Sequence, residues 1–266
     1  MVVGSRGHRS FRLKAEATSA IVGCLLAACA RITPATVPPG APLLTVLTWN
    51  THGARGDLQR FIADLESGVL TGAPPRDYVL FLQEFPNLGQ AGVGSRTHAL
   101  TLFASPVRGA TGNAIVSTIP LEEPRTIDLP RERQPRAAVV AEIRVGGQPL
   151  FVVSTHLENR LGWLRGLFGD RARGRQAEAL IQALPPGPGV VGGDFNTMLG
   201  RDEPAWRVLL QRFPDTPDRP EPTFRDRLVL DHLFFDLPDG WIVNRRVIED
   251  QYGSDHHPVI ADIHWP

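Results

Sequence analysis

The chain alternates between short apolar runs and polar or glycine-containing segments. Runs of roughly four to eight apolar residues, rich in β-branched and aromatic side chains, are typical of buried strands. Such runs predict strands at Leu43–Trp49, Tyr78–Gln83, His98–Ala104, Ala114–Ser117, Val139–Val145, Pro149–Thr155, Val190–Asp194, Val229–Phe235 and Val259–Ile263. Gly146-Gly147 predicts the tight turn of a hairpin between two of these strands.

Other segments show a helical period instead. Apolar residues recur at helical spacing in Asp57–Glu66. Helices are also predicted at Arg173–Leu184, which stops before two prolines, and at Pro204–Phe213. Because hairpins occur beside helix-separated strands, this order favours packed mixed sheets flanked by helices over a purely parallel doubly wound sheet.

Polar side chains stand within or at the ends of the apolar runs. A strand delivers its terminal side chains to one rim of its sheet, so residues from distant runs can meet in a single site. The clusters are Asn50, Glu84, His156, the Asp194/Asn196 pair, Asp231 and Asp255-His256. Carboxylate, amide and imidazole groups in combination suit a hard divalent cation and a phosphate ester.

Each cluster also has a plain structural explanation when it is taken alone. Glu84 fits a solvated loop residue, Asn50 a turn former, and His156 a core histidine bonded to the backbone. Asp194 and Asn196, one residue apart, project to the same side if the segment stays extended. The same residues fit a helix N-cap or a tight loop equally well.

Composition is ordinary for a soluble globular protein: 266 residues, 42% hydrophobic and 21% charged. We find no internal repeat and no linker after about residue 42, which predicts a single domain over residues 43–266. Of 28 basic and 28 acidic residues, four basic and one acidic lie in residues 1–28, so the remainder carries 24 against 27, about −3. This charge argues against a broad phosphate-attracting surface, although a local basic groove stays open.

The N-terminal segment has the pattern of an export signal. Basic residues between Arg6 and Lys14 precede the apolar stretch Ala17–Ala28, which is too short for a membrane span and suits the apolar region of a signal peptide. Both cysteines, Cys24 and Cys29, lie in this segment, so the body has no disulfide, thiolate metal site or catalytic cysteine.

The end of that stretch, Leu26-Ala27-Ala28-Cys29, resembles a bacterial lipobox. It predicts a lipoprotein-type signal peptide over residues 1–28, an acylated Cys29, and a Pro-rich tether over residues 29–42. We therefore expect an exported protein of the periplasm or cell envelope, attached to the membrane through its N-terminal lipid. The alternatives are a first core helix with an incidental cysteine, or a wrongly assigned start codon.

The ordered motifs TWN, LQE, GNAIVS, STHLEN, GGDFN, LDHLFF and SDHHPV resemble those of the endonuclease/exonuclease/phosphatase superfamily. These metal-dependent phosphoesterases include DNase-I-like nucleases, neutral sphingomyelinases and inositol-phosphate 5-phosphatases. Any one motif is weak, but the ordered set from about Leu44 to Ile263 is specific. The resemblance implies the DNase-I-like fold, a four-layer α/β sandwich of two packed mixed sheets with outer helices.

The resemblance also implies a magnesium site, with Mn²⁺ or Ca²⁺ as alternatives. Glu84 would be the principal ligand of Mg²⁺, because this ion prefers one or two carboxylates plus water. Asn50 would contribute an amide oxygen beside it, and Asp255 would complete the metal and phosphate environment. Asn113, in GNAIVS, would support the substrate side of the site.

Catalytic roles follow from the same resemblance. Asp194 would orient or deprotonate the attacking water, and Asn196 would steady the water and the phosphate. Asp231 would fix the tautomer of His256, which would contact the scissile phosphate and transfer a proton. His156 would stabilise the charge that builds on the phosphate oxygens.

The substrate is less well defined. Thr197-Met198 follows the GDFN motif where the 5-phosphatase branch carries an aromatic–arginine pair, so that branch is disfavoured. The segment Asn159–Arg175 combines apolar residues with five arginines. It fits an amphipathic rim that grips a phospholipid headgroup or a polynucleotide, and it fits a plain capping helix equally well.

Three hypotheses are therefore carried forward: a nuclease-like metal-dependent phosphodiesterase, a sphingomyelinase-like phospholipid phosphodiesterase, and a catalytically silent binding module. The intact set of polar clusters weighs against the third. No obligate protein partner is inferred.

Overall fold

The computed structural model describes residues 42–86, 99–103, 111–159, 169–217 and 221–265. Within these ranges the chain forms two mixed sheets, of six and five strands. The first has the order β10-β11-β1-β2-β4-β3 and contains β1 (Leu44–Asn50), β2 (Tyr78–Phe85), β3 (Ala99–Phe103), β4 (Gly112–Ser117), β10 (Ile242–Val247) and β11 (Val259–His264). The second has the order β5-β6-β7-β8-β9 and contains β5 (Glu122–Leu129), β6 (Arg136–Val145), β7 (Gln148–His156), β8 (Gly189–Asp194) and β9 (Asp231–Asp236).

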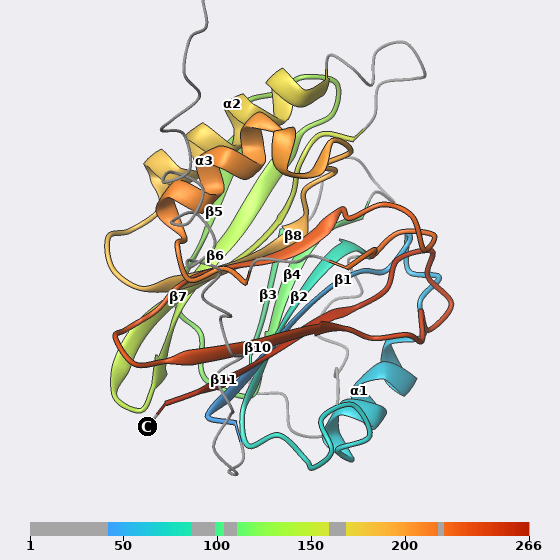
Figure 1. Cartoon of the computed structure of the whole chain (residues 1–266), viewed down its shortest axis with the longest axis vertical. Coiled ribbons are helices and arrows are strands. Elements are labelled where there is room, and N and C mark those ends of the chain that lie inside the picture. Colours follow the sequence, from blue (N-terminus) through green and yellow to red (C-terminus); the bar gives the residue numbers. More distant parts are fainter. Residues whose placement is uncertain (1–41, 87–98, 104–110, 160–168, 218–220, 266) are drawn as a thin grey trace, which may run out of the picture. The chain divides into compact units, whose positions relative to one another are not determined.

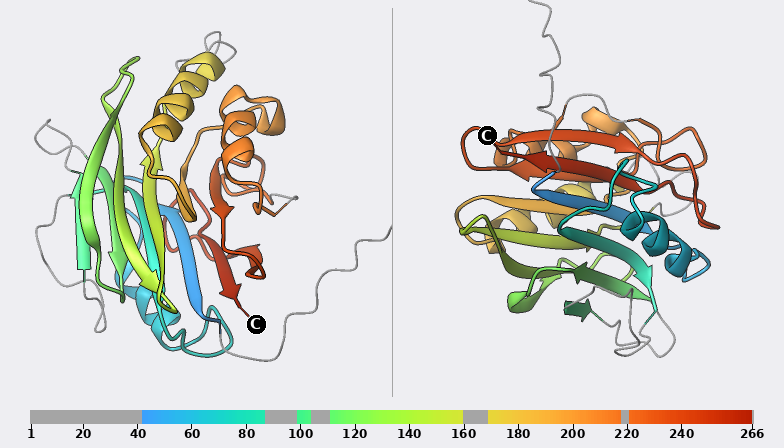
Figure 2. Two further views of the ribbon diagram at one scale, coloured as in Figure 1. Left: turned by 90° about the vertical axis from the view of Figure 1, so that its left-hand side faces the viewer. Right: turned by 90° about the horizontal axis from the view of Figure 1, so that it is seen from below.

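Helices cover the outer face of each sheet. They are α1 (Leu58–Glu66), α2 (Gly169–Ala183) and α3 (Pro204–Arg212), with a short 3-10 turn at Gly200–Asp202. In Figure 1, α2 and α3 lie over the sheet that contains β8, and α1 lies on the far side of the other sheet. The right-hand view of Figure 2 shows α1 beside the strands of the first sheet.

Three buried apolar clusters hold these layers together. Val46 and Phe81 of the first sheet meet Val152 and Val190 of the second in the central cluster. A second cluster joins the five-stranded sheet to α2 and α3, and a third joins the six-stranded sheet to α1. The order helix, sheet, sheet, helix is the four-layer α/β sandwich expected from the sequence, and that prediction is confirmed.

Local sequence signals explain several element boundaries. α1 begins at Leu58 rather than Asp57, because the Asp57 carboxylate caps the helix by accepting the backbone N–H of Arg60 at 3.0 Å. Gly146 and Gly147 have φ angles of +58° and +84°, which the predicted hairpin turn between β6 and β7 requires.

Two strands were not expected, and both are edge strands. The largely exposed β5 carries the sequence EEPRTIDL, and β10 is half-buried along its length. Since an edge strand need not bury one continuous face, neither shows the apolar alternation that reveals a strand in sequence. Four predicted starts differ from the structure by two residues or more: α2 begins at Gly169 instead of Arg173, β4 at Gly112 instead of Ala114, β6 at Arg136 instead of Val139, and β9 at Asp231 instead of Val229.

The signal peptide over residues 1–28, Cys29 and the tether up to residue 41 lie outside the described residues, as do residues 160–168 of the arginine-containing insertion. None of the helices in the described ranges is long and apolar enough to cross a membrane.

Strand register brings the polar motifs to one rim. β1 runs parallel to β2, so Asn50 lies beside Gln83, the neighbour of Glu84. β7 is parallel to β8 and β8 is antiparallel to β9, which aligns His156, Asp194 and Asp231 across the second sheet. Two adjacent glycines allow this approach.

A Cβ on Gly192 would lie 2.2 Å from the Phe81 ring, and one on Gly193 would lie 2.0 Å from the carbonyl oxygen of Thr155. Larger residues at these positions would push the second sheet away from the first and distort the strand that ends in Asp194. The GG of the GGDFN motif is therefore a packing requirement.

Candidate active site

The first sheet contributes an amide and a carboxylate. The Asn50 side-chain nitrogen lies 2.9 Å from Asp194 Oδ2 and 3.5 Å from Glu84 Oε1, so one amide group contacts carboxylates from both sheets. Glu84 has a φ of +52° and lies where the pairing of β2 with β4 shifts register. A non-glycine residue in this region costs on the order of 1–3 kcal/mol, a strain that is characteristic of functional sites.

Buried ionisable groups of the second sheet meet His256, which lies in the loop between β10 and β11 of the first sheet. His256 Nδ1 donates to Asp231 Oδ2 at 2.7 Å. The other ring nitrogen of His256 lies 3.9 Å from Asp194 Oδ2, too far for a direct hydrogen bond but close enough for one oxygen atom to contact both. His156 Nε2 lies 3.4 Å from the same Asp194 oxygen. His256 therefore stands between two carboxylates.

The loop that carries His256 is fixed from the first sheet. Ser254 Oγ donates to the carbonyl of Asn50 at 2.7 Å and accepts the backbone N–H of His256 at 3.1 Å. The indole N–H of Trp49 donates to the carbonyl of His256 at 3.2 Å. The Phe224 ring lies 4.7 Å from the imidazole ring, so backbone and side chain of His256 are both held.

Thr223 orients the partner of this histidine. Its hydroxyl oxygen accepts the backbone N–H groups of Leu230 and Asp231, each at 3.0 Å. Its carbonyl accepts the N–H of His257 at 2.7 Å. One residue thus links the start of β9 to the loop after His256.

Burial and neighbouring charges shift the pKa values of Asp194, His256 and His156 in different directions. Burial, followed by the nearby charge of Asp231, raises the pKa of Asp194 to about 7. Burial alone would lower the pKa of His256, but Asp231, with help from Asp194 and Asp255, raises it to about 9. Burial, followed by the charge of Arg136, holds the pKa of His156 well below its ordinary value. Near neutral pH the site contains a protonated His256 and a neutral His156.

Asp255 lies at the more exposed side of the site. Its carboxylate lies 3.2 Å from His52 Nδ1, 3.4 Å from Arg225 Nη2 and 4.0 Å from His256 Nε2. In the described ranges we find no direct hydrogen bond or ion pair between Asp255 and Glu84. Its role as a metal ligand stays a prediction.

The segment from Asp194 to Asn196 does not stay extended and forms the tight loop that the sequence left open as the alternative. β8 ends at Asp194, and Asn196 has a φ of +52°. The Asn196 backbone N–H donates to Asp194 Oδ1 at 2.9 Å, and its side-chain amide donates to the carbonyl of Leu157 at 3.3 Å. Asp194 is thus held by its own following turn, and this leaves its Oδ2 for Asn50 and the histidines.

Asn113 lies at the junction of the two sheets. Its amide donates to the carbonyl of Ala137 at 2.7 Å and so joins β4 to β6. The neighbouring residue in β6, Arg136, is a site residue that the sequence did not reveal.

Arg136 is largely buried. Burial lowers the pKa of Arg136, and the charges of Glu158, Asp194 and Glu84 oppose this lowering, so the guanidinium interacts electrostatically with the carboxylates of the site. Its Nε has no hydrogen-bond partner in the part of the chain that the structure describes. An arginine at the start of a strand has no sequence signal of its own, and only the β6–β7 pairing brings it here.

The donor groups fit a divalent cation. The donor atoms of Asp194, Asp231 and His256 lie within 4.8 Å of one another. Because His256 Nδ1 is already bonded to Asp231, we interpret this trio as a proton-transfer chain. The carboxylates of Glu84 and Asp194 are hard oxygen donors of the kind that magnesium prefers, whereas the Asn50 amide oxygen accepts the backbone N–H of His52 at 3.0 Å, so the role of Asn50 as a ligand stays a prediction. These two carboxylates adjoin the trio through the shared Asp194.

The sequence profile described as the Endonuclease/Exonuclease/phosphatase family matches residues 47–256, a span that includes every one of these site residues. The chain belongs to this family. The description of the family names endonucleases, exonucleases and phosphatases, enzymes that act on phosphoester bonds, and the chain has the DNase-I-like fold.

Individual relatives agree with this assignment. A UPF0294 protein of Vibrio vulnificus strain YJ016 is 31% identical over 145 residues, which cover 50% of this chain and 46% of that protein, so the chain spans under half the length of this curated relative. The human Nocturnin catalytic domain with bound sulfate superimposes with a TM-score of 0.61 at 19% identity, covering 84% of this chain and 94% of that one.

A family member from Leptotrichia buccalis superimposes with a TM-score of 0.61 at 16% identity, covering 84% of this chain and all of that one. At these identities the two solved structures show a shared fold.

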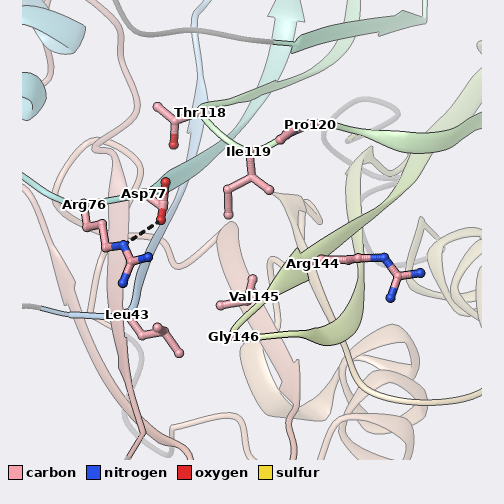
Figure 3. Close-up of a pocket in the computed structure, with 9 residues that line it drawn as sticks. All are labelled: Leu43, Arg76, Asp77, Thr118, Ile119, Pro120, Arg144, Val145 and Gly146. Atoms are coloured by element: carbon pink, nitrogen blue, oxygen red, sulfur yellow. Dashed lines mark ion pairs between the residues drawn. The ribbon is translucent and has the colours of Figure 1, made fainter.

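The opposite rim of the sandwich has a cavity of about 240 Å³, lined by Leu43, Arg76, Asp77, Thr118, Ile119, Pro120, Arg144, Val145 and Gly146. Figure 3 shows Arg76 paired with Asp77 and the Arg144 side chain directed away from the cavity. Arg144 is also paired with Glu122 and Glu142. The ion pairs offset these charges, and this rim shows no cluster like that of Asp194, Asp231 and His256.

Proposed function

We propose that the chain is a Mg²⁺-dependent, nuclease-like phosphodiesterase that hydrolyses its substrate by in-line attack of water. One observation carries the proposal: His256 lies between Asp231 at 2.7 Å and Asp194 at 3.9 Å. A protonated imidazole and a carboxylate with a pKa of about 7 thus face the same point. General acid–base catalysis needs this pairing of groups near the working pH.

The proton transfers follow from the two pKa values. Asp194 accepts a proton from the attacking water as the water oxygen forms its bond to phosphorus. The bond from phosphorus to the leaving oxygen breaks on the opposite side, and that oxygen takes its proton from water there, because His256 and Asp194 face the same point. His256 is the group that carries a proton near neutral pH, Asp231 holds its ring in place, and its free N–H is directed to the phosphate beside the attacking water.

Groups from both sheets stabilise the negative charge on the phosphate oxygens. Arg136 supplies a permanent positive charge, because a guanidinium keeps its proton in proteins. His156, neutral at pH 7, donates a hydrogen bond, and Asn196 and Asn113 shape the adjoining surface. Mg²⁺ bound by Glu84 and Asn50, with Asp255 nearby, would neutralise the phosphate oxygens and the leaving oxygen.

The substrate is a phosphate ester, either nucleic acid or a phospholipid headgroup, and the arginine in the site favours nucleic acid. Sulfate is a tetrahedral anion like phosphate, and the human Nocturnin catalytic domain of the same fold binds it. Export and acylation at Cys29 would place this activity in the cell envelope, close to a membrane.

A substrate panel tests the proposal. Purified full-length protein is incubated with Mg²⁺ and plasmid DNA, RNA or sphingomyelin vesicles, each with an EDTA control. We expect EDTA-sensitive cleavage of a nucleic acid. Turnover of sphingomyelin alone would assign the chain to the phospholipid branch, and no EDTA-sensitive turnover of any of them would contradict the proposal.

A further inference from the structure

The turn between β5 and β6, residues 130–135 with the sequence PRERQP, is here termed the arginine loop. Leu129 pairs with Arg136, so the loop is the turn of a hairpin. Ala138 of β6 pairs with Thr155, the residue before His156. The arginine loop therefore lies at the rim of the second sheet that carries the candidate active site.

A buried carboxylate fixes the backbone of this loop. Glu158 is fully buried, and its Oε2 accepts the backbone N–H groups of Arg133 at 3.0 Å and Gln134 at 3.3 Å. Its Oε1 accepts the N–H of Asn159 at 3.2 Å. A buried charge is costly unless it is paired or hydrogen-bonded. Glu158 meets that requirement through the arginine loop and through the nearby charge of Arg136.

Helix α2 holds the loop from its other side. The Gln176 amide donates to the carbonyl of Pro130 at 3.0 Å, and Arg175 forms an ion pair with Glu132. The only acidic residue of the arginine loop is thus neutralised by a helix residue. Contacts at both ends make the loop a defined part of the rim.

Two cations remain on this fixed loop. Arg131 and Arg133 are exposed, and among the described residues their side chains make no hydrogen bond or ion pair. They follow each other along the loop that leads into Arg136. The body as a whole carries about three more acidic than basic residues, so these positive charges beside the site are a local exception.

We propose that the arginine loop is a subsite for a second phosphate of a polynucleotide substrate, next to the phosphate that Arg136 meets, and that Glu158 is its positioning residue. This inference rests on the proposed function. A polynucleotide offers a row of phosphates that arginines bind without reading sequence. A phosphocholine headgroup offers one phosphate beside a cation, which Arg131 and Arg133 would repel.

Salt dependence of binding tests the subsite without requiring turnover. Full-length protein in EDTA is titrated with a fluorescein-labelled single-stranded DNA oligonucleotide at several salt concentrations, and anisotropy gives Kd. On a single strand each phosphate contact contributes about 0.7 to the slope of log K against log salt. An Arg131→Ala/Arg133→Ala variant should lose about 1.4 from the slope, roughly a sevenfold difference over a fourfold range of salt.

Glu158→Ala separates positioning from charge, and Glu158→Gln is its conservative counterpart. Glu158→Ala keeps both arginines but accepts none of the three N–H groups, so we expect most of the same loss of slope. The amide oxygen of Glu158→Gln can still accept the N–H groups of Arg133 and Gln134, so this variant should retain most of the slope. Arg125→Ala is the matched control, because Arg125 is exposed on β5 and lies outside the loop. Its slope should equal that of the wild type. Catalysis is then measured as the ratio of kcat/KM for the oligonucleotide to that for bis(p-nitrophenyl) phosphate, which should fall in the double variant.

Each contrary outcome has one meaning. An unchanged slope in Arg131→Ala/Arg133→Ala overturns the subsite, whatever Glu158→Ala does. Loop-dependent binding to sphingomyelin vesicles in place of the oligonucleotide also overturns it, because the loop then recognises a headgroup. If the slope falls as expected but the wild type hydrolyses no phosphodiester, the subsite stands and the proposed function fails.

Discussion

The two sheets contribute different chemistry to one rim. The first sheet supplies Asn50 and Glu84, and Glu84 is partly exposed and has a strained backbone. The second supplies His156, Asp194 and Asp231, all buried in a single register. Burial perturbs the pKa values of His156 and Asp194 on this second sheet. We infer that Asn50 and Glu84 bind the metal, and that proton transfer belongs to Asp194 and Asp231 of the second sheet together with His256 from the β10–β11 loop of the first.

Asp194→Asn should have the largest effect, because Asp194 belongs both to the metal-binding groups and to the proton-transfer groups. The substitution keeps the shape of the side chain but removes the base, and positioned acid–base groups contribute about 10²–10⁴-fold to rate. We expect kcat to fall by on the order of 10³-fold at saturating Mg²⁺. Asp128→Asn, an exposed residue of β5, is the control that should keep full activity. Near-normal turnover of Asp194→Asn would remove the base from the mechanism.

Glu84→Gln isolates the first sheet. We expect it to weaken activation by Mg²⁺ by at least about tenfold, since changes even to outer-shell groups of a metal site cost roughly 10–100-fold in affinity or activity. Activity measured against Mg²⁺ concentration should therefore recover in part at high Mg²⁺. Glu178→Gln, exposed on α2, should leave the Mg²⁺ titration unchanged. An unaltered titration in Glu84→Gln would place the metal elsewhere.

The pH profile isolates the proton-transfer groups Asp194 and His256. Asp194 must lose its proton to act, so kcat/KM should rise as pH increases through about 7. His256 must keep its proton, so activity should fall as pH increases through about 9. In Asp231→Asn the raising charge is gone, and the falling limb should move to lower pH by roughly one to three pH units. A limb that does not move would mean that the falling limb belongs to a group other than His256.

The motifs predicted most of this arrangement because each ends or begins a buried strand. The apolar run before Asp194 shows a strand whose last residue reaches the rim, and an antiparallel β9 returns Asp231 to the same place. The turn at Asn196 was harder to predict from the sequence, because a positive φ in a non-glycine residue does not alter the apolar periodicity.

Residues that act through tertiary pairing could not be given a role from the sequence, even where one of them, Glu158, lies within the STHLEN motif. Arg136 and Glu158 belong to segments that meet only when β6 pairs with β7, and Thr223 lies in a loop before β9. Edge strands β5 and β10 were not predicted for a related reason, because they bury no continuous apolar face. Periodicity reports burial, whereas these features depend on which segments become neighbours.

Ser254→Ala should have the smallest effect on activity, and it tests whether the metal-binding groups and the proton-transfer groups depend on each other. The hydroxyl joins the end of β1 to the loop of His256 through bonds of 2.7 and 3.1 Å. Its removal leaves two buried backbone groups unpaired, at a cost of about 1–3 kcal/mol in the free energy of unfolding, measurable in urea. Ser67→Ala, at the exposed end of α1, should cost much less.

If the two sheets act together, Ser254→Ala also lowers kcat several-fold and leaves the Mg²⁺ titration unchanged, because the loop of His256 moves while Glu84 does not. A loss of stability with full kcat would mean that β1 supports the fold alone and that His256 is positioned from the second sheet.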